Sequence, residues 1–174
     1  RDVVNFSSKL LERFYDPLID DGIEVISVAD PTASGDLISK KQFVEFALPS
    51  LKKFVKNMNK RGVKTLLHIC GNTSDKLHEI ASSNAACFSL DHKVDLAEAN
   101  EKLRGKICIA GNVNPVDVLN NGSPEDVKKA AVDCVEKAAK SGGYILIPGC
   151  DIPPTVPLDN IRSFINAARR YKLG

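Results

Sequence analysis

One histidine and two cysteines are spaced so that they could bind a single metal ion. His68 and Cys70 are two positions apart, and Cys150 lies in the segment Pro-Gly-Cys-Asp. Because residues i and i+2 of an extended strand point to the same face, His68 and Cys70 can reach one ion. Imidazole nitrogen and thiolate sulfur bind zinc at roughly 2.0 to 2.3 Å, and three protein ligands with an open fourth position are typical of catalytic zinc. The sequence therefore predicts a zinc site built from these three residues.

The pair His-x-Cys also has a structural explanation that needs no metal. It can be a hydrogen-bonded histidine beside a buried thiol. The other three cysteines are expected in the core, because Cys87 and Cys108 fall within apolar segments and Cys134 lies on the apolar side of a helix. The chain has five cysteines, an odd number, and this favours reduced thiols or metal ligands over a disulfide framework.

Two aspartates follow predicted strands near the proposed ligands. Asp91 ends the strand after His68 and Cys70, where its carboxylate could be an oxygen ligand or could cap the next helix. Asp30 precedes a proline, where it could orient a substrate, hydrogen-bond the metal-ligating histidine, or start a turn. We predict catalytic roles for Asp30 and Asp91, with capping and turn formation as the structural alternatives.

Five short apolar segments are predicted to form strands. Their hydrophobicity is nearly continuous, which is the pattern of parallel strands that are covered on both faces. Amphipathic helical segments separate them, so the sequence indicates an α/β fold. Sites in such folds form beyond the carboxyl ends of the strands, and in a closing barrel the last strand returns beside the earlier ones. The predicted strands are 23–28, 63–69, 86–90, 107–110 and 144–147.

Three longer segments have the spacing of amphipathic helices. Residues 40–61 repeat apolar side chains at helical intervals, and Pro49 is expected to kink this helix or to begin a second one. Residues 124–140 follow Ser123 as N-cap, with proline at the first helical position. Residues 158–171 are predicted to form the last helix, with basic residues at its C-terminal end.

Composition narrows the class of protein. With 174 residues, 43% apolar and 26% charged, the chain is expected to form one domain over residues 1–174. The 24 basic and 22 acidic residues are spread through the chain without a basic stripe, which argues against nucleic-acid binding. No segment approaches the roughly 20 uninterrupted apolar residues of a membrane span, and the N-terminus lacks a signal-peptide pattern. We expect a cytoplasmic protein that does not associate with membranes.

Six segments together resemble the uroporphyrinogen decarboxylase superfamily. They are Val-Ala-Asp-Pro (28–31), Phe-Ala-Leu-Pro (46–49), His-Ile-Cys-Gly-Asn (68–72), Ser-Leu-Asp (89–91), Gly-Asn-Val-Asn-Pro (111–115) and Pro-Gly-Cys-Asp-Ile-Pro (148–153). Within it, His-x-Cys with a late Gly-Cys resembles the corrinoid-dependent methyltransferase branch, typified by methylcobalamin:coenzyme M methyltransferases. The resemblance implies a (β/α)8 TIM barrel whose C-terminal portion, with about five strands, is formed by this chain. A full barrel needs roughly 200 to 250 residues, so we expect self-association or pairing with a missing N-terminal half.

The resemblance also implies a reaction. Zinc held by His68, Cys70 and Cys150 would bind a small thiol such as coenzyme M and lower its pKa, and the thiolate would attack the methyl group of methylcobalamin on a corrinoid protein. Asn72 and Asn112, which follow the second and fourth predicted strands, would contact the substrate or form turns. Two alternatives remain open: a decarboxylase that acts on a tetrapyrrole, and a non-catalytic subunit that binds zinc or a corrinoid.

Overall fold

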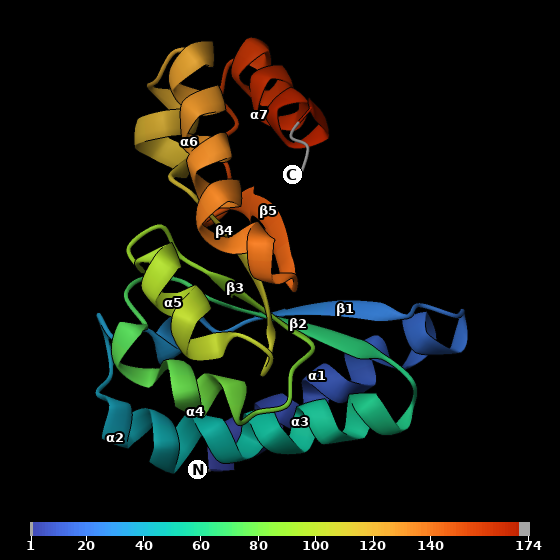
Figure 1. The fold of residues 1–174 in the computed structure, drawn as a ribbon. Helices are drawn as coiled ribbons and strands as arrows, with labels where there is room; N and C mark the ends of the chain where they lie inside the picture. The colour runs from blue at the N-terminus through green and yellow to red at the C-terminus, as the bar shows by residue number, and fades with distance from the viewer. Residues whose placement is uncertain (1, 171–174) are drawn as a thin grey trace.

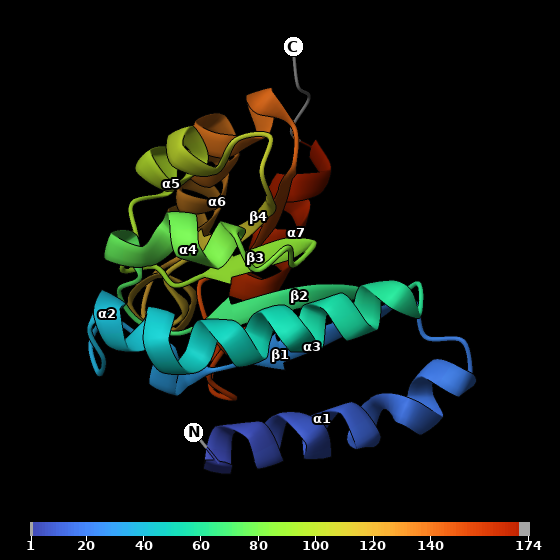
Figure 2. The same cartoon turned by 90° about the horizontal axis from the view of Figure 1, so that it is seen from below.

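The protein contains a five-stranded parallel sheet whose strands follow one another in chain order (Figures 1 and 2). The structure is a computed structural model and describes residues 2–170. Each strand pairs in parallel with the next, which is the arrangement of successive β/α units in a barrel. The strands are β1 (Val25–Ala29), β2 (Lys64–Ile69), β3 (Cys87–Leu90), β4 (Cys108–Val113) and β5 (Tyr144–Pro148).

Helices connect the strands and pack on one face of the sheet. The α-helices are α1 (Asp2–Asp20), α2 (Lys40–Gln42), α3 (Leu48–Lys60), α4 (Leu77–Ala81), α5 (Leu96–Leu103), α6 (Pro124–Ala138) and α7 (Leu158–Arg170). Short 3₁₀ turns span Pro31–Ala33, Ser74–Lys76 and Ala139–Ser141, and π-helical turns span Phe43–Ala47 and Pro115–Asn120. Among residues 2–170, no helix combines the length and the apolar character that crossing a bilayer requires.

The five predicted strands are confirmed, with shifted ends. The largest difference is in β4, which was predicted to end at Ala110 and continues to Val113. Gly111 and Asn112 therefore lie inside the strand and not after it. They are held there by pairing with Leu146 and Ile147 of β5.

The three predicted helical segments are confirmed as helices, and local residues explain where they begin. Pro49 stands at the start of α3, so it begins a second helix after the π-helical turn. Ser123 caps α6, because its hydroxyl accepts the backbone N–H of Asp126, whose carboxylate in turn accepts the N–H of Ser123. α6 ends at Ala138, and Tyr171, the predicted end of the last helix, lies outside the described residues.

Helix α1 is not among the predicted elements. Its apolar residues recur at helical spacing and form one broad stripe, a signal that the sequence carries. On one side of this stripe, Leu11 and Tyr15 pack against the core, whereas Phe6, Leu10 and Phe14 are exposed. The helix lies alongside α3 (Figure 2).

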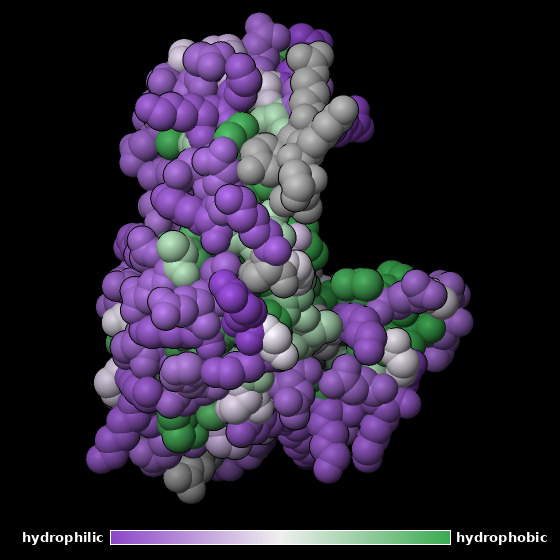
Figure 3. Space-filling view, viewed as in Figure 1, coloured by the Kyte–Doolittle hydropathy of each residue, from purple (hydrophilic) through white to green (hydrophobic). Residues whose placement is uncertain are grey.

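The two faces of the sheet have different environments. Side chains on the face that the helices cover, such as Leu67, Phe88 and Ile109, are buried in the core. Side chains of the inner face are exposed at both edges of the sheet: Val25 is 60% exposed and Ile145 is 47% exposed. The prediction that both faces are covered is therefore wrong for the described residues, because five strands do not close a barrel. Figure 3 shows apolar residues in the hollow beside β1.

Candidate metal centre

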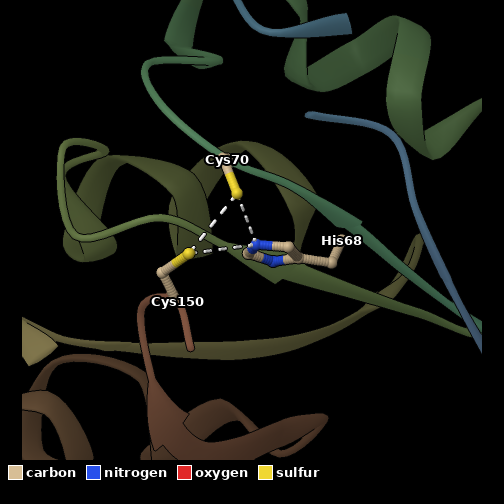
Figure 4. Close-up of side chains that lie close together, drawn as sticks. All are labelled: His68, Cys70 and Cys150. Atoms are coloured by element: carbon tan, nitrogen blue, oxygen red, sulfur yellow. Dashed lines mark hydrogen bonds between the residues drawn. The ribbon is translucent and has the colours of Figure 1, made fainter. Parts of the chain in front are cut away.

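His68, Cys70 and Cys150 point toward one another at the carboxyl end of the sheet (Figure 4). Nε2 of His68 lies 3.1 Å from Sγ of Cys70 and 3.7 Å from Sγ of Cys150. The two sulfur atoms are 3.4 Å apart. All three residues are half-buried. The structure thus brings together the three residues that the sequence selected as metal ligands, two from β2 and its end and one from the loop after β5.

Two glycines shape the turns that carry the cysteines. β2 ends at Ile69, and the chain turns at Gly71, where φ is +76°, a conformation that favours glycine. Gly149 precedes Cys150 and donates its N–H to the carbonyl oxygen of Val113 at 2.8 Å. A Cβ atom on Gly149 would lie 2.5 Å from the backbone nitrogen of His92, so a larger residue cannot occupy this position without a shift of the backbone.

The spacing of the three donor atoms fits a zinc ion. With bonds of roughly 2.0 to 2.3 Å, the ligand atoms of a tetrahedral site lie roughly 3.5 to 3.8 Å apart. The three measured separations run from 3.1 to 3.7 Å, so small side-chain rotations bring them into this range. One imidazole and two thiols also form the mixed nitrogen and sulfur set that zinc prefers. The residues present therefore suit zinc and supply three of the four ligands of a tetrahedral site.

Ser89 contacts the other ring nitrogen of His68. Nδ1 of His68 is 3.1 Å from the carbonyl oxygen of Ser89 and 3.0 Å from its hydroxyl oxygen. A carbonyl oxygen can only accept a hydrogen bond, so Nδ1 carries the proton and donates it. Nε2, the nitrogen that faces the two thiols, then has a free lone pair and is able to bind a metal.

Asp91 holds the turn that follows Cys70. Its carboxylate is buried and accepts the backbone N–H of Gly71 at 2.8 Å and that of Lys93 at 2.9 Å. Asp91 is not part of the group of donor atoms that surround the candidate site. Its carboxylate therefore supports a metal ligand through the backbone and also places a negative charge near Cys70.

The surroundings of Cys70 keep its thiol protonated in the metal-free protein. Burial raises the pKa of Cys70 to about 11, and the hydrogen-bonded thiol of Cys150 and the negative charges of Asp91 and Asp151 add to this effect. Zinc binds the thiolate form, so metal binding at neutral pH would release the thiol proton. The same negative charges attract a divalent cation to the site.

Comparison with known proteins decides the family. A family model described as "Uroporphyrinogen decarboxylase (URO-D)" matches residues 1–171. The chain belongs to the uroporphyrinogen decarboxylase family. The predicted resemblance is therefore confirmed.

Within the URO-D family, the chain is similar to several methyltransferases. It is 35% identical over 170 residues to the methylcobamide:CoM methyltransferase MtbA of Methanosarcina acetivorans, and the match spans 98% of this chain and 49% of that protein. It is 31% identical to the methylcobamide:CoM methyltransferase MtaA of Methanosarcina barkeri, over 97% of this chain and 48% of MtaA. The solved structure of a methyltransferase from Methanosarcina mazei matches with a TM-score of 0.83 and 30% identity, covering 97% of this chain and 47% of that one. The chain thus spans about half the length of these relatives.

The fold of this URO-D family member agrees with the predicted class. Its five parallel strands and flanking helices match about half of a methyltransferase with the TIM-barrel URO-D fold.

Three other predicted site residues make contacts outside the group of metal donors. Asp30 accepts a hydrogen bond from the hydroxyl of Thr32 at 2.7 Å and lines a cavity of about 490 Å³ between α1, β1 and α3. Asn72 is exposed, and its side-chain oxygen accepts the N–H of Ser74 at 3.0 Å, which is a turn contact. Asn112, the third, is buried within β4.

In this URO-D family member, the amide of Asn112 ties β4 to the loop between β3 and α5. Its nitrogen donates to the carbonyl oxygens of Asp91 at 3.1 Å and Val94 at 2.7 Å. Its oxygen lies 3.9 Å from the sulfur of Cys134. The side chain of Asn112 therefore has a structural role. It fixes the backbone of Asp91, whose carboxylate holds the Gly71 turn.

The remaining cysteines lie apart from the candidate site. Cys87 and Cys134 are buried, as expected of core residues. Cys108, also expected in the core, is half-buried and pairs in register with Cys87. Sequence reasoning missed Ser89: it lies in the Ser-Leu-Asp segment, but only the strand register shows that it stands beside His68.

Proposed function

We propose that this protein is a zinc-dependent methyltransferase that transfers a methyl group from a methylcorrinoid protein to a thiol such as coenzyme M. The observation that carries the proposal is the convergence of His68, Cys70 and Cys150 within 3.7 Å of one another. The names of the similar proteins, methylcobamide:CoM methyltransferases, support the same reaction class.

The three residues of the site would hold the metal ion that activates the substrate thiol. His68, Cys70 and Cys150 would hold zinc, which when bound supplies a Lewis acid that lowers the pKa of a substrate thiol. Cys70 would lose its proton on metal binding, in spite of the burial that raises its pKa. All three side chains are half-buried and not sealed off, so a small thiol can approach them.

The other four predicted site residues would act without binding the metal ion. We propose that Asp91 acts through the Gly71 turn, because its carboxylate bonds that backbone N–H. Asn72, exposed beside the same turn, is available to contact a substrate. Asp30 and Asn112 would act through the loops that they order. Asp30 accepts the hydroxyl of Thr32, and Asn112 donates to the backbone carbonyl of Asp91.

Two alternatives have weaker support. A tetrapyrrole decarboxylase agrees with the family, but the cluster of two thiols and an imidazole has no part in recognising the acidic side chains of a porphyrinogen. A non-catalytic subunit would use the same cluster only to bind zinc or a corrinoid. Because the chain spans about half the length of its relatives, activity would depend on the rest of the barrel, supplied by an N-terminal half or by self-association.

The free thiols also indicate a cellular location. Five free cysteines, three of them at or near half-burial, keep their chemistry only in a reducing compartment. We therefore propose a cytoplasmic location. The proposed partners are a corrinoid protein and a small thiol, with no role for nucleic acid or membrane.

The decisive experiment combines metal analysis with methyl transfer. The reduced wild-type protein should contain about one zinc ion per chain, and Cys70→Ala or Cys150→Ala should lose it. Cys108→Ala is the matched control, because that cysteine is also half-buried but lies outside the donor group. With the rest of the barrel supplied by a co-expressed N-terminal half of a relative, and with coenzyme M as acceptor, the spectrum of methylcobalamin should change only in proteins that hold zinc. A wild-type protein without zinc would overturn the proposal, and zinc without thiol-dependent demethylation in the complex with the N-terminal half would favour the binding subunit.

A further inference from the structure

The residue opposite His68 on the neighbouring strand is placed to control it. The strand register pairs His68 of β2 with Ser89 of β3, and directly paired residues of parallel strands point to the same face. The imidazole and the hydroxyl therefore share the inner face of the sheet. Ser89 is 4% exposed, so its hydroxyl is almost fully removed from water and needs a partner inside the protein.

The same row of the sheet offers no competing side chain. Continuing the register across the sheet gives Ala29, His68, Ser89, Ala110 and Ile145 as successive partners. The members of this row other than His68 and Ser89 are apolar and cannot accept a hydrogen bond from the ring.

We propose that Ser89 is a positioning residue that fixes the ring of His68 for metal binding. Its carbonyl oxygen, 3.1 Å from Nδ1, sets the tautomer that leaves the Nε2 lone pair free. Its hydroxyl, 3.0 Å from the same nitrogen, adds a second contact that restricts rotation of the ring. The result is that Nε2 faces the sulfur of Cys70 at 3.1 Å. This inference rests on the proposed metal site.

A neutral partner also suits the charge of this site. Many metal-binding histidines donate their second N–H to a carboxylate. Here Asp91 and Asp151 already place negative charge near Cys70, and two thiolates would join them once a metal is bound. A hydroxyl orients the ring without adding a further negative charge to this group.

Zinc affinity provides the first test. Ser89→Ala keeps the backbone carbonyl and removes the hydroxyl, so the zinc dissociation constant, measured by competition with a chromophoric chelator, should rise about 10-fold. Ser89→Thr keeps a hydroxyl on the same carbon and should stay within about threefold of wild type. The matched control is Ser83→Ala, because Ser83 is also buried and its hydroxyl accepts the N–H of Ala85, away from the site.

Cobalt(II) substitution provides the second test and reports on the histidine itself. In Ser89→Ala the sulfur-to-cobalt charge-transfer band should remain, because both thiols still bind, while the ligand-field bands should shift. Wild-type affinity and unchanged ligand-field bands in Ser89→Ala would overturn the inference. Equal losses in Ser89→Ala and Ser83→Ala would do the same, because they would indicate a general loss of packing.

The outcomes also separate this inference from the proposed function. If zinc binds and depends on Ser89 but no thiol is methylated even in the complex with an N-terminal half, the methyltransferase proposal fails and the positioning role stands. If Ser89→Ala binds zinc as wild type does and methyl transfer is normal, only the positioning role fails. A wild-type protein that binds no zinc overturns both.

Discussion

The buried carboxylate of Asp91 accepts the backbone N–H of Gly71 at 2.8 Å, one residue beyond the candidate ligand Cys70. A residue at the end of β3 therefore holds the turn at the end of β2. Both carboxylate oxygens are used, because the second accepts the N–H of Lys93 at 2.9 Å.

Asp91→Asn should weaken metal binding. The amide has one oxygen in place of two, so either Gly71 or Lys93 loses its acceptor and the turn at Cys70 loosens. We expect a zinc dissociation constant about 10-fold higher by chelator competition, and a loss of about 1 to 3 kcal/mol in the unfolding free energy of the metal-free protein. Asp95→Asn is the control, since Asp95 caps α5 through the N–H of Glu98. Unchanged zinc affinity in Asp91→Asn would contradict the supporting role.

Gly149→Ala should separate Cys150 from its partners. The added Cβ would lie 2.5 Å from the backbone nitrogen of His92, and backbone cannot move aside cheaply. The loop after β5 must then shift, so we expect zinc affinity to fall on the order of 10-fold. Gly105→Ala is the control, because its φ of +72° brings backbone strain but its Cβ would meet nothing within 4 Å. That variant should lose stability and keep zinc. Equal zinc affinity in both variants would refute the steric argument.

The parts of the site that the sequence predicts are those that depend on local rules. The alternation of side chains along a strand places His68 and Cys70 on one face, and five apolar segments suffice to order β1 to β5. Cys150 follows from the fold class, because a curved sheet brings the end of β5 back toward β2. These predictions need no knowledge of how neighbouring strands align.

The parts that the sequence does not predict depend on strand register and on contacts between loops. Ser89 stands beside His68 only because β3 pairs with β2 in one particular register. Asn112 was expected after β4, but pairing with Ile147 keeps it inside the strand and its amide behind Asp91. For Asp91 the sequence suggested a ligand or a helix cap, and the structure shows a third use, in the Gly71 turn.

Lys76→Met should loosen the loop between β1 and α2. Lys76 is fully buried, and its Nζ donates to the carbonyl oxygens of Ala33 at 3.2 Å and Ile38 at 3.0 Å. Methionine fills the same volume but leaves both carbonyls without this donor, so we expect a loss of about 2 to 4 kcal/mol in unfolding free energy. Lys93→Met, which breaks an exposed ion pair with Asp36, should cost less than about 1 kcal/mol. Limited proteolysis should cut Lys76→Met first within residues 31–39. Equal stability of the two variants would contradict this role.

Alkaline pH should destabilise the metal-free protein through Cys87. Burial, together with the neighbouring thiol of Cys108, raises the pKa of Cys87 from 9.0 to about 12. The folded state thus favours the protonated thiol, and this stabilisation is complete below pH 9 and is lost as the pH rises toward 12. Relative to Cys87→Ala, the wild type should lose at most about 1.4 kcal/mol for each pH unit in this window. The measurement is urea unfolding of both proteins at several pH values. A stability difference that does not change with pH would disprove it.

The open inner face should make the isolated chain associate. Val25 and Ile145, on the two edge strands, are 60% and 47% exposed, and β1 and β5 each have an unpaired edge within the described sheet. Unpaired strand edges beside exposed apolar side chains favour pairing with another chain. Light scattering should therefore give a mass above that of one chain, and a co-expressed N-terminal half of a relative should form a one-to-one complex instead. Val25→Lys combined with Ile145→Lys should shift the chain toward the monomer, because each lysine puts a charge into the contact. Leu37→Lys is the control, since Leu37 is 68% exposed but lies in the loop after β1, outside the inner face. A monodisperse monomer for the wild-type chain would contradict the prediction and would mean that the five strands are stable with their inner face in water.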